Sequence, residues 1–173
     1  MKREKWQPLL KWGILSVLLL LFYAFQTTPG LFQLGWIKPI LIVALVVCVS
    51  MYEGAMASAL YAMAAGLLWD ISSDKLFGFN GLILMLCGMF ISLLCIYYLH
   101  TKLVNSLLFC TVTVLVQGLL DYFFYYAVWN PDGAVIALVR NILPTAAYTV
   151  AVTPLVFLLV RLIERHMSPV ERV

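Results

Sequence analysis

The chain has 173 residues, of which 64% are hydrophobic and 11% are charged, and its mean hydropathy is +1.01. Soluble domains contain about 45–50% apolar and about 25% charged residues, so this composition excludes a water-soluble globular protein. Eleven Lys and Arg against eight Asp and Glu give a net charge of +3, without the long basic run that is typical of nucleic-acid binders. Residues 1–173 are therefore expected to form a single polytopic membrane domain.

Long apolar runs separated by charged or turn-forming residues predict an all-α bundle of six transmembrane helices. In chain order, these helices cover about residues 12–28, 37–52, 54–70, 78–99, 103–128 and 135–162. Pro29 and Gly30 end the first run, a polar loop separates the third from the fourth, and an Asn-Pro-Asp-Gly turn follows the fifth.

The break at Glu53 and Gly54 needs support from a second argument. Without it, residues 39–69 would form one helix about 46 Å long, against a hydrocarbon core of about 30 Å. Six spans with both termini in the cytoplasm place eight Lys and Arg inside, Lys11 among them, and three outside, whereas five spans give six against five. Because Lys and Arg accumulate on the cytoplasmic side, the charge count favours six spans.

Small residues recur every four positions along the third predicted span. They are Gly54, Ser58, Ala62 and Gly66. Such a stripe lets two membrane helices approach closely. We favour packing inside the bundle as its role, because small-residue stripes usually pack helices, with a partner helix as the alternative.

Charged and amide side chains within the later spans are expected to have partners, because a charge in the membrane costs about 3 kcal/mol on insertion scales. Asp121 and Arg140 lie at similar depths in their predicted helices and can form a pair. Gln117, one turn before Asp121, and Asn141, beside Arg140, would complete this intramembrane polar cluster.

Asp70 lies at the end of the third span, where the helix macrodipole opposes a negative charge. We expect the following loop to fold back as a staple, so that backbone N–H groups near Gly78, or the Lys75 ammonium, compensate the carboxylate. A contact of Asp70 with a partner or ligand is the alternative interpretation.

No sequence motif of a catalytic, metal or cofactor site is present. The four cysteines lie in apolar runs without a CxxC pair or a neighbouring histidine, and are expected to be core residues. We therefore expect no catalytic, metal or cofactor-binding residues, no cofactor and no enzymatic activity.

Several short motifs together resemble one known family. They are Gly66-Leu-Leu-Trp-Asp70, then Leu76-Phe-Gly78-Phe-Asn-Gly81, and later Asn141-Ile-Leu-Pro144 with Pro154-Leu155. This pattern, together with the length, the six spans and the short loops, resembles the rod shape-determining protein MreD family. The likeness covers nearly the whole chain.

The resemblance implies a multi-pass protein of the bacterial inner membrane that acts as a scaffold of the cell-elongation (rod) complex. Its implied partners are the bitopic protein MreC and, indirectly, the MreB filament, RodA and its transpeptidase partner, and it supports rod cell shape and peptidoglycan synthesis. The family is also similar in fold to the S components of energy-coupling-factor transporters.

A membrane solute-binding subunit of a transporter, similar to an S component, is the alternative function. It would need a polar cavity, lined by Asp70, Gln117, Asp121, Arg140 and Asn141. The self-neutralising pair Asp121 and Arg140 argues against such a cavity. In addition, the first helix lacks the alanine stripe through which S components contact their transport partner.

Overall fold

A computed structural model describes residues 3–28, 38–73, 76–127 and 143–167. Within these ranges the chain forms six α-helices and one π-helical segment, and no strand. The prediction of an all-α fold is confirmed. The helices in chain order are α1 Arg3–Thr27, α2 Leu41–Ser50, α3 Ala55–Ile71, α4 Phe79–Tyr97, α5 Leu103–Asp121, the π-helix η1 Tyr122–Ala127, and α7 Leu143–Met167.

Four of these helices are long and apolar enough to cross a membrane. The candidate spans are Leu9–Thr27, Phe79–Tyr97, Leu103–Phe124 and Leu143–Met167. Helix α3, with 17 residues, is about 25 Å long. Helix α2 has only ten residues, about 15 Å, and is too short to cross a core of about 30 Å by itself. The structure thus describes a short helix over residues 41–50 within the segment predicted as the second span, residues 37–52.

The predicted break at Glu53 and Gly54 is present. Helix α2 ends at Ser50, and the N–H groups of Met51 and Glu53 donate back to the carbonyls of Val47 and Val49. Gly54 is extended, with φ −68° and ψ 158°, and α3 begins at Ala55. The turn over residues 51–54 thus divides the long apolar run into two helices.

Helix α2 is the centre of the bundle. All ten of its residues are buried, and it contacts α1, α3, α4, α5 and α7. Its sequence, Leu-Ile-Val-Ala-Leu-Val-Val-Cys-Val-Ser, is apolar on every side, as expected of a helix with neighbours all round.

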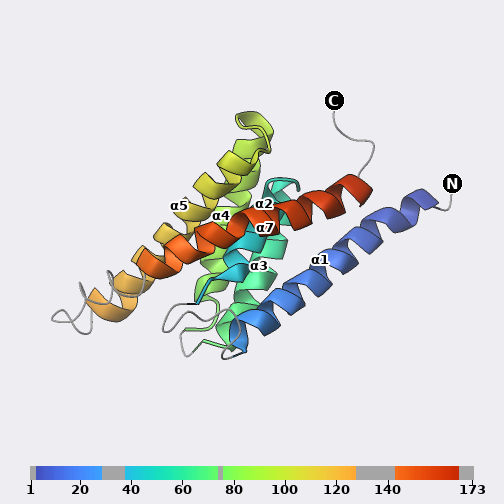
Figure 1. Ribbon diagram of the computed structural model, residues 1–173. Helices are drawn as coiled ribbons and strands as arrows, with labels where there is room; N and C mark the ends of the chain where they lie inside the picture. The colour runs from blue at the N-terminus through green and yellow to red at the C-terminus, as the bar shows by residue number, and fades with distance from the viewer. Residues whose placement is uncertain (1–2, 29–37, 74–75, 128–142, 168–173) are drawn as a thin grey trace.

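The N-terminal end of α1 and the C-terminal end of α7 lie at the same end of the molecule (Figure 1). Helix α7 runs to Met167, beyond the predicted limit at residue 162. Helix α1 begins at Arg3, before the predicted start at residue 12. Both helices therefore extend past their predicted limits at this shared end.

Candidate functional site

The small-residue stripe of α3 packs against α4 inside the bundle. Ser58, Ala62 and Gly66 are buried. A Cβ added at Gly66 would lie 2.5 Å from the Cα of Gly81, and one added at Gly88 would lie 2.8 Å from the Cβ of Ala62. The two helices therefore approach each other closely at Ala62 and Gly66, where there is no room for a larger side chain.

Gly54 does not belong to this close contact. It is exposed, and a Cβ added there would meet no atom within 4 Å. Gly54 precedes the first residue of α3, and its extended backbone forms part of the turn over residues 51–54. The structure therefore places Gly54 in this turn and not in the small-residue stripe.

The Asp70 carboxylate receives four hydrogen bonds at the start of α4. Oδ1 accepts from the Asn80 backbone N–H at 3.2 Å and from the Asn80 amide at 2.8 Å. Oδ2 accepts from the backbone N–H groups of Gly78 at 2.9 Å and Gly81 at 3.2 Å. Asp70 thus satisfies N–H groups that have no partner within α4 itself.

This arrangement resolves the electrostatic problem of Asp70. The carboxylate ends α3, where the macrodipole disfavours it, but it also lies at the N-terminus of α4, where the macrodipole favours it. The chain reaches this geometry through Gly78, whose φ of +91° is in the left-handed region that favours glycine. Lys75, the other expected partner, lies outside the described residues.

Gln117 extends the hydrogen bonding from α4 to α5. Its amide Nε2 donates to Asn80 Oδ1 at 2.9 Å, and both residues are about 1% exposed. We call Asp70, Asn80 and Gln117 the amide cluster. It joins three helices, and Asn80 was not among the residues expected to take part.

The predicted cluster around Asp121 is only partly described. Asp121 ends α5 and is half-buried, whereas Arg140 and Asn141 lie outside the described residues. The Asp121–Arg140 pair therefore stays a prediction. In the structure, Gln117 forms a hydrogen bond with Asn80, which in turn contacts Asp70.

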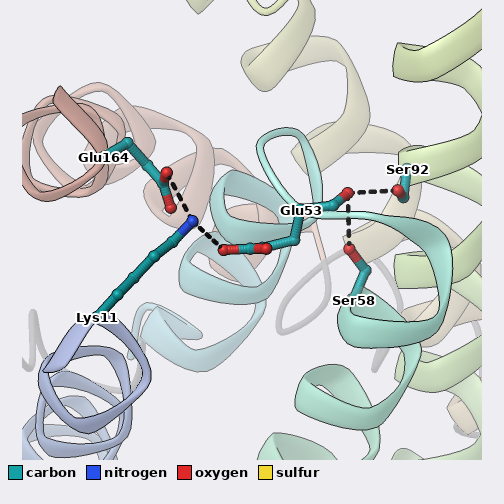
Figure 2. Close-up of polar contacts among 5 residues, drawn as sticks. All are labelled: Lys11, Glu53, Ser58, Ser92 and Glu164. Atoms are coloured by element: carbon teal, nitrogen blue, oxygen red, sulfur yellow. Dashed lines mark hydrogen bonds and ion pairs between the residues drawn. The ribbon is translucent and has the colours of Figure 1, made fainter. Parts of the chain in front are cut away.

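A second polar cluster lies at the other end of α3, and three of its members are charged. Lys11 Nζ of α1 is 2.5 Å from Glu53 Oε1 and 2.9 Å from Glu164 Oε2 of α7. Figure 2 shows the ammonium between the two carboxylates. The side chain of Glu164 is 3% exposed, and those of Lys11 and Glu53 are 12% and 13% exposed.

Two serine hydroxyl groups bind the backbone of the turn over residues 51–54. The Glu53 carbonyl accepts hydrogen bonds from Ser92 Oγ of α4 at 2.6 Å and from Ser58 Oγ of α3 at 3.3 Å (Figure 2). We call Lys11, Glu53, Ser58, Ser92 and Glu164 the turn cluster. It fastens α1, α3, α4 and α7 to the turn after α2.

Sequence reasoning missed the turn cluster. Sequence patterns predict Lys11 as a cytoplasmic cation and Glu53 as a helix break, and they give Glu164 no role. The available signal was the depth of each charge, because Lys11 and Glu164 both lie inside candidate spans near the shared end of α1 and α7. Charges in such positions usually face the protein interior and have partners.

The described residues offer no group of three or more His, Cys, Asp or Glu that could hold a metal ion. Buried carboxylates are instead compensated by backbone N–H groups at one end of α3 and by Lys11 at the other. Together with four helices long and apolar enough to cross a membrane and many exposed apolar side chains, these links between helices indicate an α-helical membrane protein.

Comparison with known families identifies the class more closely. The sequence model of the rod shape-determining protein MreD family matches residues 7–166. This range covers most of the chain, which therefore belongs to the MreD family, and the predicted resemblance is confirmed. No curated protein and no solved structure matches the chain.

Membership of the family gives the protein a role in the determination of rod shape. The family consists of shape-determining structural proteins and is not known for an enzymatic activity. The apolar helices and the family together make the chain an integral membrane protein.

Proposed function

We propose that this protein is a non-catalytic scaffold of the cell-elongation complex in the bacterial inner membrane. It binds MreC, and through MreC it helps to connect MreB filaments with peptidoglycan synthesis by RodA and its transpeptidase partner. Its membership of a shape-determining family supports this role. The observation that carries the proposal is the large outward surface of α1.

Helix α1 is the least buried candidate span. Only 17% of its most apolar window is buried, compared with 33–39% for the three other long helices. Its inward face carries Leu15, Leu19 and Phe22, all buried. These spacings of four and three residues are those of one helix face, so the opposite face remains available.

The outward face of α1 is suited to a partner helix. It includes Gly13, Val17, Leu20 and Ala24, all exposed and again spaced by four or three residues. A Cβ added at Gly13 would meet nothing within 4 Å, so a neighbouring helix can approach the backbone there. Close approach at small residues is what associates helices in a membrane, where apolar burial alone provides little driving force.

The orientation proposed for the bundle has both chain ends in the cytoplasm. The N-terminal end of α1 and the C-terminal end of α7 lie at the same end of the bundle, in agreement with the Lys11–Glu164 ion pair. Arg161, Arg165 and Lys102 are exposed at or near that end of the helices, and such cations favour the cytoplasmic side.

The test is co-purification of MreC with the full-length chain and with two matched variants. Gly13→Leu places a bulky side chain on the outward face of α1, and Ala151→Leu does the same at an exposed position of α7. We expect Gly13→Leu to lower the recovery of MreC by about tenfold or more, or about 1.4 kcal/mol. Ala151→Leu should leave the recovery unchanged.

Two results would contradict the proposal. If the wild-type chain, folded and abundant, recovers no MreC, the scaffold role through MreC is wrong. If MreC is recovered but Gly13→Leu and Ala151→Leu behave alike, the outward face of α1 is not the interface.

A further inference from the structure

An open cavity of about 1050 Å³ lies beside the turn cluster. Its walls come from α1, the turn after α2, the end of α4, the α4–α5 connection and α7. Lys11, Glu53 and Glu164 lie on its wall, together with Lys102, which is exposed. The cavity thus has charged groups on its wall.

The wall of this cavity carries groups of both charge signs. One ammonium, that of Lys11, is shared by the carboxylates of Glu53 and Glu164. Lys102, at the start of α5, supplies a positive charge to the same cavity. A complementary ligand has a cationic group for the carboxylates and an anionic group for Lys102.

The ends of two candidate spans indicate that the cavity opens near the boundary between bilayer and water. The candidate span of α4 ends at Tyr97, and that of α5 begins at Leu103. Tyr97 and Tyr98 line the cavity and are 73% and 81% exposed. Tyrosine is enriched at the headgroup level of membranes, and the neighbouring Ile96, 58% exposed, offers apolar surface to an acyl chain.

We propose that this cavity binds the headgroup of a phospholipid that carries a primary ammonium, namely phosphatidylethanolamine. The ammonium donates hydrogen bonds to the Glu53 carboxylate, the nearby Glu164 carboxylate adds negative charge, and the lipid phosphate lies against Lys102. The acyl chains remain in the bilayer beside α4. Such a lipid carries both charges that the cavity requires and is anchored at the depth where the cavity opens.

The chemistry of the ammonium predicts selectivity among lipids. A primary ammonium has three N–H donors, whereas the quaternary ammonium of phosphatidylcholine has none. Phosphatidylglycerol has the phosphate without a cation, so it can satisfy Lys102 but not the two carboxylates. Charge-assisted hydrogen bonds are about twice as strong as neutral ones, which makes the donor count decisive.

Native mass spectrometry measures this selectivity. The full chain is released from vesicles that contain equal amounts of phosphatidylethanolamine, phosphatidylcholine and phosphatidylglycerol. We expect about tenfold more phosphatidylethanolamine than phosphatidylcholine to stay bound. Glu164→Gln and Glu53→Gln should each reduce that ratio to about threefold or less. Lys102→Gln should weaken retention of both phosphatidylethanolamine and phosphatidylglycerol, and Gln117→Leu, at the other end of α3, should change nothing.

Equal retention of the three lipids by the wild-type chain overturns the inference, as does a preference that survives both glutamate substitutions. Binding of a lysine-rich peptide is the second readout. If this peptide binds the wild-type chain and no lipid is preferred, the cavity binds a protein side chain and the lipid assignment is wrong. Lys102 is exposed, so Lys102→Gln keeps the test decisive even where a glutamate variant fails to fold.

Discussion

Helices α1 and α2 are both apolar, yet they have opposite surroundings. Every residue of α2 is buried among the other helices, whereas 17% of the apolar window of α1 is buried. An apolar helix surface is about equally stable against lipid tails and against other apolar helices, so hydrophobicity alone does not distinguish α1 from α2. The centre of the protein therefore holds the helices together, while the outward face of α1 contributes little to that packing.

A few polar contacts fasten α1 to that centre. Lys11 contacts Glu53 and Glu164, Leu15 accepts a hydrogen bond from Tyr61 at 2.9 Å, and the side chain of Gln26 accepts one from α2 at 3.2 Å. They are distributed along the helix, so α1 is held firmly by its inward face. The following predictions break the centre or its links to α1, beginning with the largest effect.

Gly66→Ala should abolish folding of the bundle. The added Cβ would lie 2.5–2.7 Å from backbone atoms of Asn80 and Gly81, which cannot rotate away as a side chain can. Separating α3 from α4 also breaks the hydrogen bonds to Asp70. We expect no monodisperse protein in size-exclusion chromatography of the fluorescently tagged chain. The matched control is Gly13→Ala, also within a helix, where nothing lies within 4 Å.

Lys11→Met should destabilise the protein by about 3–5 kcal/mol, because it leaves two largely buried carboxylates without their cation. The measurement is the fraction of folded protein after a heating series in detergent. Adding Glu53→Gln and Glu164→Gln to Lys11→Met should recover much of the loss, since the buried charges are then gone. A single variant as stable as the wild type would contradict the ion pairs.

Asp70→Asn should cost about 1–3 kcal/mol. Four N–H donors converge on the carboxylate, and an amide NH₂ in place of one oxygen would face a donor. The charge that favours the N-terminus of α4 is also lost. Thermal unfolding followed by the same chromatography checks this prediction, with Ser72→Ala as the exposed control. Equal losses in both variants would contradict the assigned role of Asp70.

Gln117→Leu should have the smallest effect on stability, about 1 kcal/mol. It removes one hydrogen bond to Asn80 but also removes the buried Gln117 Oε1, which has no hydrogen-bond partner within the described residues. If this variant loses more stability than Asp70→Asn, then Gln117 rather than Asp70 is the centre of the amide cluster.

The sequence was sufficient to predict the all-α membrane class, the break at Glu53 and the family. Length, apolar runs and turn residues can be interpreted from the sequence without knowing which helices are neighbours. It did not reveal that α2 is too short to cross a membrane by itself, because an apolar segment has the same composition whether lipid or protein surrounds it.

The polar clusters were only partly predictable for a related reason. The position of Asp70 at a helix end showed that it needs compensation, which is a local argument. Its pairing with Asn80 and Gln117, and that of Lys11 with Glu53 and Glu164, depend on which helices are neighbours. Spacing within one helix does not contain that information, so these contacts emerge only from the packing of the bundle.

Rod-shape complementation by Gly13→Leu tests the central claim most directly, which is that the exposed surface of α1 carries the function. Cells depleted of this protein receive either the variant or Ala151→Leu, and cell shape is compared at equal amounts of folded protein in the membrane. The account predicts round cells with Gly13→Leu and rods with Ala151→Leu. Rods of normal form with Gly13→Leu would contradict it.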